Sequence, residues 1–132
     1  RGDYIGMVFQ SPRFVSNISI LDNLCLSQYL SNKKKDVIRA TQLLAQVGLE
    51  HKIHNKAKEL SQGEQQRAAI ALSVVKKPKL ILADEPTSSL DDINCVKTVN
   101  LLKEQAALNK ASLIIITHDH RLKSQFKNHI YL

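Results

Sequence analysis

The fold class is decided by residues 80–86, whose sequence is LILADEP. Four successive apolar residues predict a buried β-strand, because a strand that is covered on both faces does not alternate polar and apolar side chains. Two acids, Asp84 and Glu85, follow this strand at once. In open parallel sheets ligands bind beyond the carboxyl ends of the strands, so these carboxylates are the first candidate functional groups.

Apolar runs at residues 4–9 and 112–117 predict two more strands of the same kind, and residues 129–132 predict a last one. Capping residues and apolar periodicity predict helices over residues 19–30, 36–47, 61–76 and 92–108. Strands that alternate with helices indicate an α/β fold with a mainly parallel sheet.

Residues 1–132 are expected to form one domain with an insertion. Residues 11–77 are mostly helical, which is far more chain than a crossover between two parallel strands needs. We therefore expect an inserted helical subdomain over 11–77, while residues 1–10 and 78–132 build the core around the sheet.

The net charge is +7 and the pI is about 9.5, which raises the question of nucleic-acid binding. The basic residues are scattered, and the only dense run, Lys33-Lys34-Lys35, is typical of a solvated connector. Aromatic residues make up only 5% of the chain, so we expect no nucleic-acid partner. Cys25 and Cys95 fit no ligand spacing and indicate a reducing compartment rather than a disulfide framework.

Asp84 and Glu85 are expected to have different roles, because neighbouring residues on an extended chain point to opposite sides. One carboxylate can help to hold Mg²⁺, and the other can orient or deprotonate an attacking water. The alternative interpretation is a charged turn or helix cap before Pro86.

His118 directly follows the strand over residues 112–117. Parallel neighbours end at the same edge of a sheet, so His118 is expected near Glu85, where an imidazole can donate to a γ-phosphate. The alternative is an ordinary turn histidine with satisfied hydrogen bonds.

Residues 60–67 read LSQGEQQR and predict the start of a helix at Ser61. The free N–H groups of a helix N-terminus attract anions, and Gly63 allows a phosphate to approach the backbone closely. An ordinary capping box between Ser61 and Glu64 explains the same residues equally well.

Short motifs with these residues occur in one order along the chain, at residues 8–10, 60–65, 80–87, 89–91 and 117–119. In this order and spacing they resemble the Q-loop, signature, Walker B, D-loop and H-loop of ABC-type ATPases. The resemblance covers nearly the whole chain and implies a partial P-loop NTPase fold.

By this resemblance, Asp84 and Gln10 would help to hold the Mg²⁺ that accompanies ATP. Glu85 would polarise the attacking water, His118 would contact the γ-phosphate, and Gln10 would also couple the site to a partner.

The family works as a head-to-tail dimer that closes over two ATP molecules. The signature would therefore contact ATP held by a second subunit, through Ser61, Gln62, Gly63 and Glu64. The D-loop would lie across the subunit interface, through Ser89, Leu90 and Asp91.

The chain departs from the family at Gln62, where the family has Gly, and at Glu64, where it usually has Gln. Glu64 would repel a bound anion unless it faces away or pairs with Arg67. The phosphate-binding loop Gly-x-x-x-x-Gly-Lys-Ser/Thr does not occur in the sequence. We expect it upstream of Arg1, so the chain alone is expected to be a fragment without measurable ATPase activity.

The resemblance implies the ATP-binding subunit of a transporter, with a transmembrane permease as partner and a position on the cytoplasmic face of the membrane. Residues 64–67 and 83–87 look most like subunits for lipoprotein release or macrolide efflux. The alternatives are a soluble ABC protein that acts on the ribosome or DNA, and a non-catalytic fragment.

Overall fold

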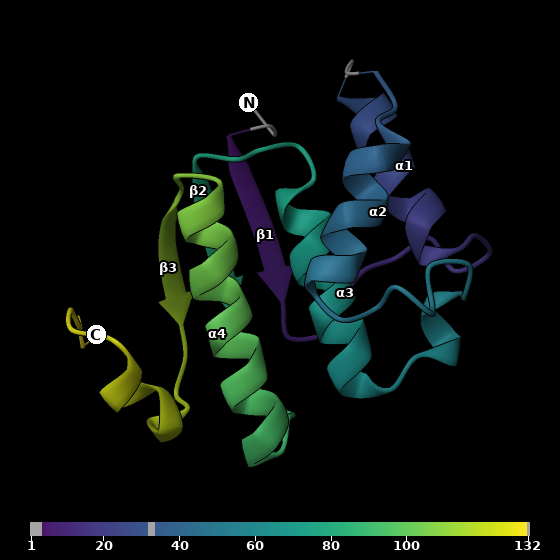
Figure 1. The fold of residues 1–132 in the computed structure, drawn as a ribbon. Coiled ribbons are helices and arrows are strands. Elements are labelled where there is room, and N and C mark those ends of the chain that lie inside the picture. The colour runs from purple at the N-terminus through teal and green to yellow at the C-terminus, as the bar shows by residue number, and fades with distance from the viewer. Residues whose placement is uncertain (1–3, 32–33, 132) are drawn as a thin grey trace.

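Three parallel strands form the sheet, in a computed structural model that describes residues 4–31 and 34–131 (Figure 1). They are β1 (Ile5–Phe9), β2 (Leu80–Asp84) and β3 (Ser112–Ile116), in the order β1-β2-β3. Phe9, Asp84 and Ile116 stand level with one another, so the carboxyl ends of the strands reach the same edge. The parallel α/β sheet expected from the apolar runs is confirmed.

The helices begin where the capping residues predict. They are α1 (Ile20–Leu30), α2 (Val37–Gln46), α3 (Gln62–Val74) and α4 (Asp92–Leu108), with short 3₁₀ helices η1 (Ala57–Glu59) and η2 (His120–Gln125). Each long helix is capped by a side chain that accepts from the backbone N–H three residues ahead, at Ser19, Asp36, Ser61 and Asp91. Within the described ranges, no helix has both the length and the apolar character that a membrane span requires.

The strand expected over residues 129–132 is wrong for the part that the structure describes. Residues 129–131 have no strand pairing, and Ile130 and Tyr131 are 87% and 74% exposed. Apolar residues favour a strand only where a sheet face can bury them, and here none does. Leu132 lies outside the described residues, as do Arg1 and Lys33.

One face of the sheet carries the core. Its side chains come from Val8, Ile81 and Ala83, which are fully buried, and from the half-buried Leu113 and Ile115. Helices α3 and α4 cover this face. Gly6 permits the approach of α3, because a Cβ atom at this position would overlap the carbonyl oxygen of Ser73.

The opposite face of the sheet is open among the described residues. It presents apolar side chains that are 40–53% exposed, from Ile5, Met7, Ile114 and Ile116. The sheet therefore buries only one of its two apolar faces within the part of the chain that the structure describes.

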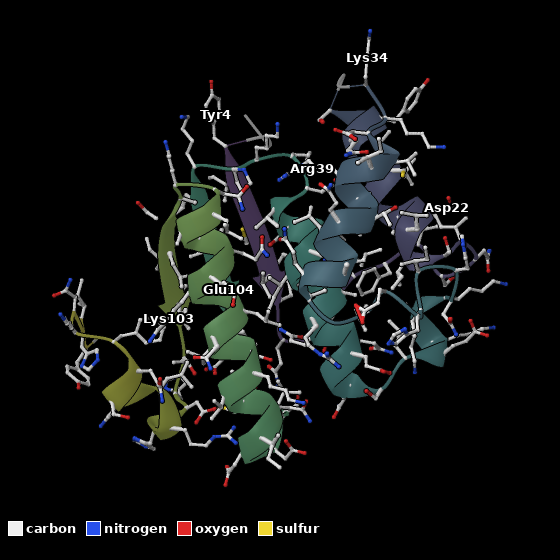
Figure 2. All side chains as sticks on the ribbon, viewed as in Figure 1. Tyr4, Asp22, Lys34, Arg39, Lys103 and Glu104 are labelled. Carbon is white, nitrogen blue, oxygen red and sulfur yellow. The ribbon has the colours of Figure 1, made fainter. Side chains whose placement is uncertain are left out.

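Arg39 ties α2 to the ends of two other helices (Figure 2). Its guanidinium donates to the carbonyl oxygens of Val74 and Val75, at 2.7 and 3.0 Å, and to Asn109 Oδ1 at 3.2 Å. Burial lowers the pKa of Arg39 from its usual value. Carbonyl groups at a helix C-terminus lack partners within the helix, so Arg39 caps α3.

Candidate functional site

The candidate site is built at the carboxyl edge of the sheet. Gln10 follows the last residue of β1, Asp84 ends β2, and His118 comes two residues after β3. Because the strands are in register, they bring Gln10, Asp84, Glu85 and His118 to one edge. Asp84, Gln10 and His118 are exposed there and accessible to a ligand.

Glu85 is anchored to the segment that follows β3. Its carboxylate accepts from Thr117 Oγ1 at 2.9 Å through one oxygen and from the backbone N–H of His118 at 3.0 Å through the other. Its own N–H donates to the carbonyl of Ile116 at 2.8 Å. The expected closeness of Glu85 and His118 is therefore observed, and the carboxylate keeps lone pairs for a further donor.

Glu85 does not continue the strand, so the expectation that Asp84 and Glu85 point to opposite sides of one extended chain is wrong in its reason. Its φ of +49° lies in the left-handed region, so the alternation of extended residues stops at Asp84. Such a conformation costs a non-glycine residue about 1–3 kcal/mol unless its surroundings hold it. The hydrogen bonds to Ile116, Thr117 and His118 hold Glu85 in this conformation, and Asp84 and Glu85 diverge for this reason.

The donor set at this edge fits Mg²⁺. Asp84 offers a carboxylate and Gln10 an amide oxygen at the ends of adjacent strands. Mg²⁺ prefers oxygen ligands and usually binds through one or two carboxylates together with water and phosphate. Among the residues that the structure describes, no group of three or more His, Cys, Asp or Glu could hold a metal by itself.

A buried polar cluster that the sequence analysis missed lies beside this edge. Thr87 is fully buried, and its hydroxyl donates to Asp119 Oδ2 at 2.7 Å. The Arg121 guanidinium donates to both oxygens of the same carboxylate, from Nε to Oδ1 at 2.9 Å and from Nη2 to Oδ2 at 2.7 Å. The Arg121 guanidinium, followed by the Thr87 hydroxyl, holds the pKa of Asp119 well below its usual range despite burial.

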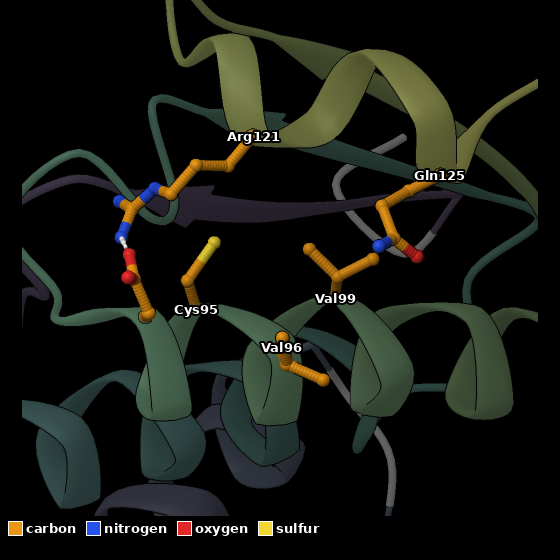
Figure 3. A pocket seen from close by; sticks show the side chains of 6 residues that line it. Cys95, Val96, Val99, Arg121 and Gln125 are labelled. Carbon is orange, nitrogen blue, oxygen red and sulfur yellow. Dashed lines mark hydrogen bonds and ion pairs between the residues drawn. The ribbon is translucent and has the colours of Figure 1, made fainter.

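Arg121 also reaches the loop that follows Glu85. Its guanidinium donates to the carbonyls of Thr87 and Leu90 and to Asp92 Oδ1, at 2.9, 3.0 and 2.9 Å. It borders a cavity of about 230 Å³ between α4 and η2 (Figure 3). The cavity is lined by Asp92, Cys95, Val96, Val99, Arg121 and Gln125.

Ser61 and Glu64 form a capping box at the start of α3. Glu64 N–H donates to Ser61 Oγ at 3.2 Å, and Ser61 N–H donates to Glu64 Oε1 at 2.9 Å. Glu64 does not pair with Arg67, which was one of the two expected ways to offset its charge. Its partner is Lys52, whose Nζ lies 3.0 Å from Glu64 Oε2, whereas Arg67 donates to the carbonyl of Val47. The Ser61 N–H, followed by Lys52, lowers the pKa of Glu64. The cap and the ion pair together offset part of the repulsion that Glu64 would exert on an anion.

Gly63 lies against α4 rather than in open space. A Cβ atom here would stand 2.7 Å from Asn94 Oδ1 and 2.9 Å from Asn94 Cγ. Asn94 in turn donates from its backbone and its amide to the two carboxylate oxygens of Asp91, at 2.7 and 3.3 Å. The structure thus brings Gly63 and Asp91 together through Asn94, while Gln62 and Ser89 are exposed and Leu90 is buried.

Gly63→Ala is expected to lower the free energy of unfolding by about 1 kcal/mol, because the new methyl group displaces Asn94. Urea unfolding of the full-length protein measures this loss. In the double variant Gly63→Ala/Asn94→Ala the collision is gone, so most of the loss should be recovered. A single variant as stable as the parent would contradict the packing shown here.

Gln66 is a second polar residue that the sequence analysis did not single out. It is 2% exposed, and its Nε2 donates to the carbonyl oxygen of Phe9 at 3.1 Å. Phe9 directly precedes Gln10, so α3 fixes the backbone from which Gln10 projects. A glutamine on the buried face of a predicted helix, next to an arginine, was the only signal in the sequence.

The parallel sheet, which helices cover on one face and which carries acids and a histidine at its carboxyl edge, fits the P-loop NTPase fold. Solved structures agree with this class. The ATP-binding cassette MJ0796, described as a dimer in a post-hydrolysis state with bound ADP and phosphate, is similar with a TM-score of 0.76 and 32% identity. The match covers 92% of this chain and 55% of that one.

The sequence profile of the ABC transporter family matches residues 1–88, and the chain belongs to this family. A further solved relative is CbiO1 of Clostridium perfringens, part of the ABC transporter complex CbiONQ. Its TM-score is 0.75 and its identity is 33%, over 89% of this chain and 48% of that one.

Curated relatives include the lipoprotein-releasing system ATP-binding protein LolD of Rickettsia bellii (strain RML369-C). It is 37% identical over 124 residues, which are 92% of this chain and 56% of the relative. LolD of Nitrobacter winogradskyi is 37% identical over 130 residues, 97% of this chain and 56% of the relative. The chain spans about half the length of the curated relatives it matches.

Proposed function

We propose that the chain is part of an ATP-binding and ATP-hydrolysing subunit of an ABC transporter. The subunit would couple ATP hydrolysis to export or extraction of its substrate. The observation that carries this proposal is Glu85, whose carboxylate is held on Thr117 and His118 at the carboxyl edge of a parallel sheet. The similarity to LolD favours release of lipoproteins from a membrane.

In this proposal Glu85 orients the attacking water and accepts its proton. The hydrogen bonds of Thr117 and His118 keep the carboxylate in place, and positioned proton acceptors of this kind contribute about 10²–10⁴-fold to a rate. The exposed side chain of His118 donates to the γ-phosphate. Asp84 and Gln10 would hold Mg²⁺, which neutralises charge on the phosphates when it is bound.

The start of α3 acts on the ATP of a second subunit in a head-to-tail dimer. The exposed Ser61 and Gln62 lie at a helix N-terminus, whose free N–H groups and dipole attract a phosphate. Gly63 and the capped Glu64 belong to the same first turn. The D-loop residues Ser89, Leu90 and Asp91 would line the same subunit interface. The proximity of Gly63 to Asn94, which bonds to Asp91, supports this part of the proposal.

The partners of the whole subunit are ATP, the second ATPase subunit and a transmembrane permease. Through the permease, the subunit lies on the cytoplasmic face of the membrane. Residues 11–77 then form the helical subdomain, and residues 1–10 and 78–132 the part of the core that carries the acids and the histidine.

The full-length protein is expected to hydrolyse ATP only with Mg²⁺, whereas residues 1–132 alone should bind Mg-ATP too weakly to detect. The phosphate-binding loop supplies most phosphate contacts in this family, and its pattern is absent from these residues. Titration calorimetry with Mg-ATP compares the two proteins, and phosphate release measures the activity.

Micromolar binding of Mg-ATP by residues 1–132 alone would overturn the second expectation. A full-length protein that binds ATP but releases no phosphate would overturn the proposed hydrolysis. A full-length protein that hydrolyses ATP but does not copurify with a membrane permease would overturn the proposed transporter.

A further inference from the structure

We propose that Arg121 is a positioning residue for hydrolysis, which fixes the loop over residues 87–91 against the segment that anchors Glu85. The proposal rests on the proposed function. One guanidinium joins two segments of the site that are more than 30 positions apart in the sequence.

Every N–H of the guanidinium is used. Nε donates to Asp119, Nη1 to the carbonyl of Leu90 and to Asp92, and Nη2 to Asp119 and to the carbonyl of Thr87. The fixed planar fork of arginine matches this divergent set of acceptors, whereas the single ammonium of lysine cannot reach them all. Arg121 therefore imposes a geometry and does not merely supply a charge.

The cluster is connected to the carboxylate of Glu85 by a short chain of hydrogen bonds. Arg121 fixes Asp119, and the backbone N–H of Asp119 donates to Thr117 Oγ1 at 2.9 Å. The same hydroxyl donates its proton to Glu85 Oε2 at 2.9 Å. Since Thr117 accepts from one neighbour and donates to the other, a shift of Asp119 changes how the Glu85 carboxylate is held.

On its other side the guanidinium fixes the loop that leads to Asp91. The carbonyls of Thr87 and Leu90 both accept from Arg121, and the N–H of Leu90 closes the turn by donating to Thr87 O at 3.0 Å. Asp91, the next residue, caps α4 and contacts Asn94 beside Gly63. Arg121 thus sets the position of the loop that the proposed function assigns to the subunit interface.

If Arg121 only stabilised the fold, its replacement would affect ATP hydrolysis no more than the replacement of Arg39. Arg39 also holds two backbone carbonyls and a side-chain oxygen, but it does so at the C-terminal end of α3, through Val74, Val75 and Asn109. Arg39 is therefore a matched control, in which a comparable set of hydrogen bonds is lost without contact with the loop or with Glu85.

The test compares Arg121→Gln, Arg121→Lys and Arg39→Gln in the full-length protein, at a temperature at which all three are folded. Arg121→Gln is expected to lower kcat for ATP hydrolysis about tenfold or more while KM for Mg-ATP changes less than about threefold. Arg121→Lys should recover part of kcat, since it keeps the charge beside Asp119. Arg39→Gln should lower Tm and leave kcat within about twofold of the parent.

Hydrogen exchange of the loop amides gives a second readout that does not depend on ATPase activity. Arg121→Gln should speed the exchange of residues 87–91, in particular the amide of Leu90, and Arg39→Gln should not. Unchanged exchange in this loop would overturn the proposal, even in a full-length protein without activity. In an active parent, a kcat of Arg121→Gln within twofold of wild type, or a raised KM alone, would also overturn it and leave the proposed function standing.

Discussion

Glu85→Gln in the full-length protein is expected to lower kcat for ATP hydrolysis by about two orders of magnitude or more, with ATP binding retained. The amide has nearly the same shape as the carboxylate but cannot accept a proton from water. Its oxygen can still accept from the N–H of His118, and its NH₂ group can donate to Thr117 Oγ1. The loop should therefore keep its form, and the loss should fall on kcat rather than on folding.

Steady-state phosphate release and calorimetry with Mg-ATP separate these effects. Glu104→Gln is the matched control, because Glu104 is an exposed carboxylate on α4 (Figure 2) and is not among the candidate site residues. It removes the same charge and should leave kcat unchanged. An unaltered rate of hydrolysis in Glu85→Gln would exclude Glu85 as the group that activates water.

Gly6→Ala is expected to lower the free energy of unfolding by about 3 kcal/mol, and Tm by on the order of 10 °C. The added Cβ would overlap the carbonyl oxygen of Ser73, and the backbone of α3 cannot give way as a side chain does. Helix α3 must then move off β1, which strains the hydrogen bond from Gln66 to Phe9. We therefore expect a lower kcat as well, since Gln10 follows Phe9.

Gly48→Ala is the control for this prediction. Gly48 has a φ of +79°, and a Cβ there would meet only the flexible end of Arg67, at 2.9 Å. The expected loss is about 1–2 kcal/mol from the left-handed backbone alone. Thermal unfolding of both variants in the full-length protein tests the ranking, and a Gly6→Ala variant no less stable than Gly48→Ala would contradict the packing of α3 on β1.

The strands and helix starts were predictable because their causes are local. Continuous apolar runs marked β1, β2 and β3, and the caps at Ser19, Asp36 and Ser61 each bond to a backbone N–H only three residues ahead. The strand expected at residues 129–132 failed because strand formation also needs a neighbour and a core face, which a local pattern cannot supply.

The residues of the carboxyl edge were predictable for a related reason. Parallel strands in register bring their ends together, so His118 could be placed near the acids from the strands alone, whereas Gln10 was assigned to this edge through the family resemblance. The left-handed form of Glu85 was not predictable, because residues that follow another strand hold it.

The sequence did not predict the polar residues that form hydrogen bonds between distant segments. Arg121 meets Leu90 across 31 positions, and Gln66 meets Phe9 across 57. In the sequence such residues look like ordinary surface side chains, because only the packed structure shows which of them are buried and which acceptors face them.

The anchoring of Glu85 has a consequence for the order in which the protein is made. Its carboxylate is held by Thr117 and His118, which leave the ribosome 32 and 33 positions later. Until β3 has been synthesised and has paired with β2, residue 85 lacks the partners that favour its left-handed backbone. Strand β2 can pair with β1 before β3 is made, but Glu85 acquires its anchored conformation only after residues 112–118 have been synthesised.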